Sequence, residues 1–275
     1  MQTSNQQKEI LAQLSEGIKE LSSSKKWQEY LKFQTVFHNY SFSNVLLILK
    51  QCPDATHVAG YNAWKKLDRH VRKGEKAISI LAPIFYRQVP EANEKIASEN
   101  EKRLCGFKTV KVFDISQTEG RPIPSPCQNL TEGNYDSTYS NLIETADLIG
   151  FMVREDKLPE GINGNCSHQE KLITINCANS SPQKVKTLSH ELGHAILHDN
   201  FDNRPVAELE AESVAYVVCS YLGIDSGLYS FGYILSWASG DENAVQMIKT
   251  SCERIQKASE SIIKMLSVQT AKVAA

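Results

Sequence analysis

The sequence predicts an α+β fold divided into two domains. Three observations lead to this prediction: apolar residues at helical spacing near both ends of the chain, short strand-like runs in the middle, and one stretch rich in Pro, Gly, Ser, Thr and Asn. That stretch covers residues 120–140 and reads as a linker. We therefore expect an N-terminal α+β domain over residues 1–125. A mainly helical domain with a small β-sheet should follow over residues 126–275.

In the N-terminal domain, helices are expected first and strands after them. Apolar positions recurring every three or four residues predict helices over 8–22, 27–37 and 61–67, and residues 42–50 are expected to form a buried helix or a turn-flanked segment. Alternating runs predict strands over 77–82, 85–86 and 108–113. Pro83 should end the first strand, and the polar residues 90–104 fit a solvated hairpin loop.

In the C-terminal domain, one helix should precede a strand pair, and three longer helices should follow it. The expected helices cover 138–149, 182–198, 206–222 and 241–267, and the expected strands cover 161–166 and 171–176. Pro182 follows two serines, which is a typical start of a helix.

Composition excludes several classes of protein. Hydrophobic residues make up 41% and charged residues 23%, as in ordinary folded soluble proteins. The net charge of -2 means that any nucleic-acid surface must be a local patch. The seven cysteines are scattered without C-x-x-C spacing, which argues against a disulfide framework. No apolar signal segment or membrane-length run occurs, so a cytoplasmic protein without a membrane partner is expected.

One five-residue pattern carries chemistry. Residues 190–194 read H-E-x-x-H in the middle of the amphipathic helix expected over 182–198. Residues four apart share one face of a helix, so His190 and His194 can bind one ion. Zinc lowers the pKa of a bound water to about 7, and Glu191 can then take the proton. The pattern therefore predicts a Zn²⁺ site for peptide hydrolysis, in preference to a helix with two surface histidines.

A catalytic zinc needs a third protein ligand, and the next helix offers glutamates. Glu208 and Glu212 are four apart on one face, whereas Glu210 points roughly to the other side. Peptidases of the gluzincin type use a glutamate on a downstream helix as ligand, and an acidic residue one turn later orients a histidine. By that likeness Glu208 is the expected ligand. Glu212 is expected to orient a ligand histidine without touching the metal. The reverse assignment, or an acidic solvent face, stays open.

His198 is a competing third ligand because it follows His194 by four residues. Three histidines on one straight helix span about 12 Å of axis, which one ion does not easily bridge. The longer spacing of metzincins is also absent. We expect His198 to be structural or to lie at the rim of the site.

Three further features near the motif are weaker candidates. His168 or Tyr216 could stabilise a transition state, although a loop histidine and a core tyrosine are the favoured interpretation. The strand expected over 171–176 precedes the zinc helix and could pair with an extended substrate.

A basic segment with aromatic neighbours lies in the first domain. Phosphates are held by such local clusters, and each base stacked on an aromatic ring adds about 1–3 kcal/mol. The same pattern also fits a solvated helix over an aromatic core, so the residues alone leave both interpretations open. The candidate contacts are Tyr40, Tyr61, Trp64, Lys65, Lys66, Arg69, Arg72, Lys73 and Lys76.

Residues 187–198, together with the E-L-E-A-E run at 208–212, resemble the ImmA/IrrE metallopeptidases. In that family two histidines and a downstream glutamate bind zinc, which implies His190, His194 and Glu208 here. This chain has Glu212 where that family has Asn or Asp, and no proline follows in residues 216–221. The departure puts substrate choice in doubt more than zinc binding.

The first half is similar to the N-terminal domain of the ArdC antirestriction proteins. The matching stretches are residues 37–44, 60–64, 71–78 and 112–118. This resemblance implies a domain that binds single-stranded DNA, joined to a zincin-like metallopeptidase domain and carried on mobile elements. It also favours the DNA interpretation of the basic segment.

Two functions fit these expectations best. The first is a zinc peptidase localised on single-stranded DNA, where it would cleave a protein or peptide substrate. The second is an antirestriction protein that only binds single-stranded DNA and keeps a structural or vestigial zinc site. A weaker third is a repressor-specific peptidase whose first domain recognises a protein. Glu191 favours an enzyme, since a structural zinc site has no use for a base.

Overall fold

The computed structural model describes residues 2–87, 102–122, 135–199, 203–224 and 242–273. Helices and small sheets both occur, which confirms the predicted α+β class. The chain forms two compact units, Met1–Gly17 with Leu46–Ile123 and Ile18–Val45 with Pro124–Ala275. Within the described ranges, no helix combines the length and apolarity needed to cross a bilayer. All six cysteines in these ranges have free thiols, as expected.

The first unit contains two small antiparallel sheets. The larger has the order β1-β4-β3, with β1 at Val58–Ala59, β4 at Lys102–Asp114 and β3 at Ile78–Arg87. The smaller pairs β2 (Arg69–Val71) with β5 (Thr118–Gly120). The short helices are α4 (Tyr61–Lys66) and the 3₁₀ turn η1 (Ile115–Gln117). The helices α1 (Gln2–Glu20) and α3 (Phe42–Gln51) are each shared between the two units.

Strand β3 corrects one prediction. It runs through Pro83, which pairs with Phe107 of β4, so the predicted stop at Pro83 is wrong. The reason is that β3 is an edge strand, where a residue without an N–H can face away from the ladder. The predicted loop 90–104 is wrong for residues 102–104, which belong to β4, and the rest of it lies outside the described residues.

A buried carboxylate fixes the turn that follows β4. Asp114 Oδ1 accepts hydrogen bonds from the N–H groups of Thr56 and His57 at 2.8 and 3.0 Å. Its Oδ2 accepts one from Ser116 at 2.8 Å. Burial alone would raise the pKa of Asp114, but these hydrogen bonds outweigh it and lower the pKa. The carboxylate thus joins two segments of the first unit that are distant in sequence.

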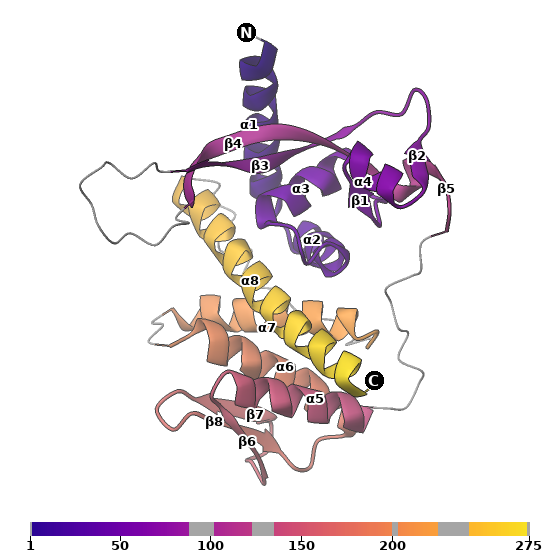
Figure 1. The fold of residues 1–275 in the computed structure, drawn as a ribbon. Coiled ribbons are helices and arrows are strands. Elements are labelled where there is room, and N and C mark those ends of the chain that lie inside the picture. Colours follow the sequence, from indigo (N-terminus) through magenta and orange to yellow (C-terminus); the bar gives the residue numbers. More distant parts are fainter. Residues whose placement is uncertain (1, 88–101, 123–134, 200–202, 225–241, 274–275) are drawn as a thin grey trace, which may run out of the picture. The chain divides into compact units, whose positions relative to one another are not determined.

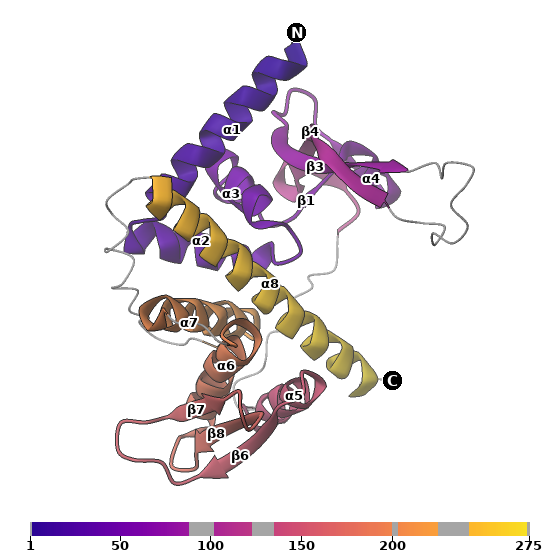
Figure 2. The same cartoon turned by 90° about the vertical axis from the view of Figure 1, so that its left-hand side faces the viewer.

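The second unit is layered. Its sheet has the order β6-β8-β7, with β6 at Met152–Asp156, β8 at Leu172–Asn176 and β7 at Gly164–Ser167. Its helices are α2 (Ser24–Val36), α5 (Tyr135–Leu148), α6 (Ser181–Leu197), α7 (Arg204–Tyr221) and α8 (Glu242–Val273). Figures 1 and 2 show α6 lying between the sheet and α7. The last three helices match the predicted ones to within a few residues, except that α8 continues six residues past the predicted end at 267.

The segment Ile18–Val45 is part of this second core. Trp27 of α2 is fully buried, and its Nε1 donates to Ser213 Oγ of α7 at 3.1 Å. Gln256 of α8 donates to the carbonyl oxygen of His38 at 3.1 Å. The sequence assigned this segment to the N-terminal domain. The predicted boundary at 125/126 lies outside the described residues and stays a prediction.

Candidate metal centre

Helix α6 presents the two motif histidines on the face that borders a cleft and faces α7. Val185, Leu188 and Leu192 are fully buried on its other side, which fixes the rotation of the helix. His190 and His194 are therefore one turn apart, with ring centroids separated by 4.8 Å. Their Nε2 atoms lie 3.1 Å from each other.

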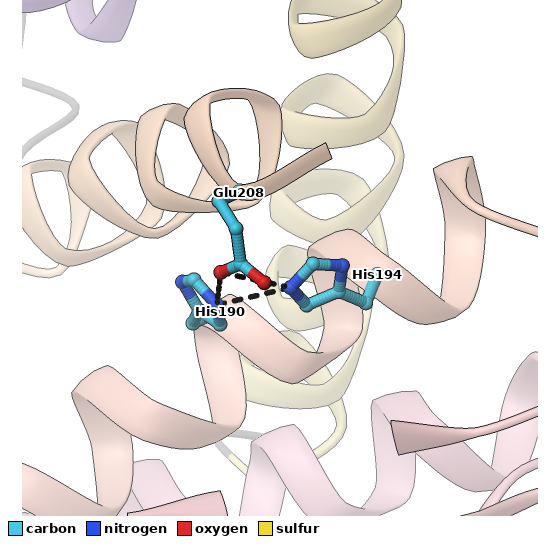
Figure 3. Close-up of side chains that lie close together, drawn as sticks. All are labelled: His190, His194 and Glu208. Carbon is cyan, nitrogen blue, oxygen red and sulfur yellow. Dashed lines mark hydrogen bonds and ion pairs between the residues drawn. The ribbon is translucent and has the colours of Figure 1, made fainter. Parts of the chain in front are cut away.

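Helix α7 supplies the third donor. The Asn203 side chain caps its first turn by accepting from the N–H of Val206. One turn into the helix, Glu208 reaches toward both rings, as Figure 3 shows. Its Oε2 lies 3.5 Å from His190 Nε2 and 3.6 Å from His194 Nε2. The three residues that the sequence predicted as ligands are thus brought together.

The geometry of this triangle fits a zinc ion. Ligand atoms of a tetrahedral zinc with bonds near 2.0–2.1 Å lie about 3.3 Å apart, close to all three observed separations. Two imidazoles and one carboxylate form the donor set of several catalytic zinc sites. The Glu208 side chain is 52% exposed, so the triangle is open on one side. A fourth position there can take water or a substrate atom.

Gly193 allows the two helices to approach closely. A Cβ atom at this position would lie 3.0 Å from the Cα of Ala211 on α7. Because that neighbour is backbone, it cannot rotate away. The glycine inside the motif therefore sets how closely Glu208 can approach the histidines.

His190 has a second carboxylate on its far side. Its Nδ1 lies 3.1 Å from Glu212 Oε2, and Lys186 Nζ lies 3.7 Å from the other oxygen of that carboxylate. Glu212 therefore occupies the outer position that the sequence favoured, and it is Glu208 that lies at the donor triangle.

Hydrogen bonds to the two glutamates shift the pKa of His190. Burial alone would lower it, but Glu208 and Glu212 raise it to about 9. Hydrogen bonds from His190 and His194 hold the pKa of Glu208 well below its usual range. Without metal, His190 is thus a cation at neutral pH that donates from both ring nitrogens.

Glu191 lies beside the donor triangle at the edge of a cleft of about 790 Å³. Its side chain is only 6% exposed, and burial raises its pKa although both neighbouring histidines oppose the shift. A Cβ atom on Gly164 of β7 would lie 2.9 Å from Glu191 Oε1. The absent side chain at Gly164 is therefore what leaves room for this carboxylate.

The cleft also contains a cysteine. Burial and the nearby Glu191 charge raise the pKa of Cys166 to about 12. The thiolate is the nucleophilic form of cysteine, so this thiol is inert at neutral pH. Cysteine-based hydrolysis is not what this cleft supports.

His198 is not part of the donor triangle. Its Nδ1 lies 2.9 Å from His194 Nδ1, on the side of that ring opposite to the triangle. Its side chain is 5% exposed and contacts Glu210, so the expected structural role, rather than a rim position, fits its place. Burial, the largest influence, lowers the pKa of His198, which keeps its ring neutral.

His168 lies near the site with its ring already engaged. Its Nε2 lies 3.0 Å from the carbonyl oxygen of His194, to which it can donate. This contact anchors the end of α6 instead of offering a donor to a substrate. Tyr216 lies on α7, and no role in the site follows from its placement.

Comparison with known proteins matches both parts of the chain. Residues 3–113 match the family described as the N-terminal domain of anti-restriction factor ArdC. Residues 148–219, which include the donor triangle, match the IrrE N-terminal-like domain. The chain is ArdC-like. It joins a region similar to the ArdC N-terminal domain to a region similar to the IrrE N-terminal domain.

Two solved structures and one curated protein are similar to this chain. The metal-free crystal structure of antirestriction protein ArdC from plasmid R388 aligns with a TM-score of 0.53 at 20% identity, covering 83% of this chain and 85% of that chain. The Mn(II)-bound structure of the same protein aligns with a TM-score of 0.52 at 19% identity, covering 82% of this chain and 85% of that chain. An uncharacterized protein of Bacillus anthracis is 27% identical over 307 aligned residues, covering 96% of this chain. The ArdC-like chain spans about half the length of that relative, 52%.

The residues expected to contact DNA differ in exposure. In the ArdC-like chain, Trp64 is 1% exposed and its Nε1 donates to the carbonyl oxygen of Phe113 at 2.9 Å. Its ring belongs to the core of the first unit and offers no face to a base. Tyr61 is about half exposed, with Lys65 Nζ 5.1 Å from its ring centroid. Tyr40 belongs to the second unit and packs edge-on against Phe37.

The two arginines of the basic segment are engaged within the protein. Arg69 donates to Thr118 Oγ1 at 2.8 Å and to the carbonyl oxygen of Arg121 at 2.6 Å. Arg72 pairs with Glu75 at 2.7 Å. Arg69 is half-buried, whereas Arg72 and the four lysines Lys65, Lys66, Lys73 and Lys76 are exposed.

Sequence reasoning missed two residues of the metal centre. Glu210 was expected to point away from the site, and it does point away from the cleft, but there it contacts His198. Arg254 of α8, which lies 2.9 Å from Glu210, had no signal in the sequence. Helical spacing identifies neighbours on one helix only, so a partner from another helix could not be found this way.

Proposed function

We propose that this ArdC-like chain is a zinc-dependent peptidase joined to a domain that binds single-stranded DNA, serving antirestriction or the maintenance of a mobile element. The observation that carries the proposal is the position of Glu191. Its carboxylate is buried at the edge of the cleft, next to three converging donor atoms. A site that only stabilises the fold needs no such base and no adjoining cleft.

The proposed roles follow from the contacts of each side chain. His190, His194 and Glu208 would hold the ion, and their two nitrogens and one oxygen favour zinc over Mn²⁺, which prefers oxygen ligands. When bound, zinc would act as a Lewis acid toward water and a scissile carbonyl. Glu191 would accept a proton from water and return it to the leaving amine. Burial raises the pKa of Glu191, which moves it from its usual acidic range toward neutral pH.

Strand β7 is the proposed platform for a substrate. Strand β8 was the candidate from sequence, but that expectation is wrong because β6 and β7 pair with both of its edges. Strand β7 is an edge strand, and its residues Gly164, Asn165 and Cys166 line the cleft. An extended peptide can add to such an edge through backbone hydrogen bonds with little sequence preference.

The substitution Glu191→Gln tests the enzymatic proposal. It keeps the shape of the side chain but removes the base. We expect peptide cleavage to fall about 10²–10⁴-fold, with zinc affinity unchanged. Cleavage would be read by mass spectrometry on a proteome-derived peptide library, with and without oligo-dT.

The matched control is Glu144→Gln on the exposed face of α5, which should cleave like the wild type. Zinc-loaded wild type that cleaves no peptide under either condition would contradict the proposal, and so would full activity of Glu191→Gln.

A second candidate is protection of single-stranded DNA without proteolysis. The match to the ArdC N-terminal domain and the four exposed lysines of the basic segment favour it. Under this function, Glu191→Gln would protect DNA from restriction as well as the wild type. The two functions are compatible, because the four exposed lysines and the proposed zinc residues lie in different units.

A further inference from the structure

The far side of His194 is connected to a buried chain of polar groups. His194 Nδ1 lies 2.9 Å from His198 Nδ1, and His198 Nε2 lies 3.0 Å from Glu210 Oε2. The same oxygen lies 2.9 Å from Arg254 Nε. The side chains of His198 and Glu210 are 5% and 1% exposed. Three helices, α6, α7 and α8, therefore contribute to one hydrogen-bonded chain.

The hydrogen bonds of this chain permit one arrangement of protons. A carboxylate ion only accepts, so His198 Nε2 must carry a proton and donate to Glu210. Arg254 already neutralises Glu210, and the His198 side chain is only 5% exposed, so a second positive charge on the His198 ring would be buried without a compensating negative charge. The ring is therefore neutral, its Nδ1 accepts, and His194 Nδ1 is the donor between the two rings. This leaves the lone pair of His194 on Nε2, the atom in the donor triangle.

We infer that His198, Glu210 and Arg254 are positioning residues that hold His194 in the tautomer whose Nε2 can bind the metal. The inference rests on the proposed metal site. It concerns residues that the motif does not contain, and Arg254 lies beyond the part of the chain that matches the IrrE-like domain. Helix α8 is therefore required for a well-formed metal centre, although it supplies no ligand.

The two metal-site histidines are supported in different ways. His190 contacts the carboxylate of Glu212 directly, and that side chain is 26% exposed. On its Nδ1 side, His194 is linked to a carboxylate only through the buried ring of His198. The negative charge of Glu210 is offset by Arg254, which also donates to the carbonyl oxygen of Leu197 at the end of α6. Such outer partners orient a ligand and change metal affinity without touching the ion.

A purely structural role for the same residues makes a different prediction. If they only join α6 to α8, their removal lowers the stability of the fold but leaves the protons of His194 and the zinc affinity of the folded protein unchanged. The tautomer of His194 and the zinc affinity of the folded protein therefore distinguish a positioning role from a purely structural one.

The test uses the full chain, stripped of metal and labelled with ¹⁵N-histidine. Long-range ¹⁵N–¹H correlation spectra report which ring nitrogen carries the proton. We expect the proton of His198 on Nε2 and that of His194 on Nδ1. A His194 ring protonated on Nε2 alone would overturn the inference. This measurement needs no variant and so does not depend on whether a variant folds.

Zinc affinity, measured by competition with a chromophoric chelator, is the second readout. His198→Phe and Arg254→Met should each bind zinc about 10- to 100-fold more weakly, which is typical for loss of an outer partner. Arg254→Lys should restore much of the affinity because it keeps the cation. The matched control is Glu253→Gln, the adjacent and more exposed position on α8, which should bind zinc like the wild type.

Failure of this inference is distinguishable from failure of the proposed function. Folded His198→Phe and Arg254→Met proteins with wild-type zinc affinity would overturn the inference, even if the wild type cleaves peptides. A wild type that binds zinc with the expected tautomers but hydrolyses nothing would overturn the peptidase and leave the inference standing.

Discussion

His190 and His194 lie on one helix face, but the protons on their rings are controlled differently. His190 faces two glutamates, and its pKa in the metal-free protein is raised to about 9. His194 Nδ1 contacts another imidazole, and in the tautomer inferred above its Nε2 carries no proton that an ion would have to displace. At the residue scale, metal binding at neutral pH must therefore remove a proton from His190.

The pH dependence of zinc binding follows from this proton. Zinc binds only the neutral ring, and below the pKa the neutral fraction falls about tenfold per pH unit. We expect the apparent zinc affinity to rise about tenfold per pH unit from neutral pH to about pH 9 and then to level off. Calorimetry in buffers of different ionisation enthalpy would count the released protons.

The matched variant for this prediction is Glu212→Gln, which removes one of the charges that raise the pKa of His190. It should shift the plateau to lower pH. An affinity that does not change between neutral pH and pH 9 would contradict the assignment of the proton.

Single residues also show what sequence could predict. The motif predicted His190, His194 and Glu191, and likeness to gluzincins predicted Glu208. The three proposed ligands do lie together, because helical spacing fixes which side chains share a face. The buried state of Trp64 could not be predicted, since a tryptophan that stacks on bases and one that fills a core have the same sequence neighbours.

Helices α6 and α7 form the metal centre together, and their separation is set by Gly193 and Ala211. A side chain at Gly193 would meet main-chain atoms of Ala211. Contact between main-chain atoms therefore limits how closely the two helices approach. The long helices were predicted well because each has many turns of apolar periodicity.

The short strands were not predicted. β1, β2, β5 and β6 have two to five residues, too few for alternation to stand out. β6 is also exposed along most of its length, so no buried face marks it in the sequence. Pairing between distant segments, which is not visible in local sequence, creates these elements.

The substitution Gly193→Ala tests the helix contact. The added methyl group would lie 3.0 Å from the Cα of Ala211, so the helices must separate slightly. Glu208 would then move away from the histidines. We expect zinc affinity to fall about tenfold or more and the free energy of unfolding of the metal-free protein to fall by about 1–3 kcal/mol.

Chelator competition and denaturant unfolding measure these two effects. Gly60→Ala is the matched control, because a Cβ atom there would meet nothing within 4 Å. Wild-type zinc affinity in Gly193→Ala would show that Glu208 does not depend on the helix spacing.

At the scale of the whole molecule, the proposed zinc residues and most of the proposed DNA residues belong to different compact units. Only Tyr40 falls in the unit that carries the metal centre. The length of the chain and the linker-like composition of residues 120–140 could predict a division into two domains. The assignment of residues 18–45 to the second part could not be predicted, because it depends on buried contacts such as Trp27 with Ser213.

DNA binding should therefore be separable from zinc binding. Changing Lys65, Lys66, Lys73 and Lys76 together to Ala should weaken binding of oligo-dT and reduce its salt dependence. Each lost phosphate contact lowers the slope of log affinity against log salt by about 0.7 for a single strand. Zinc affinity should not change. Fluorescence anisotropy at several salt concentrations measures the slope.

Alanine at Lys157 and Lys257, two exposed lysines of the second unit, provides the control. Oligo-dT binding that is insensitive to the four substitutions would exclude the basic segment as the DNA surface.

The bond between Trp27 and Ser213 has a consequence for how such proteins can exchange parts. A natural or engineered swap of N-terminal halves at the proline-rich stretch would carry α2 along with the incoming half. The helix that bears Glu208 would then receive a foreign neighbour in place of the one it packs against. Hybrids between diverged relatives should tolerate an exchange better when the donor's tryptophan and the recipient's serine have been inherited as a pair.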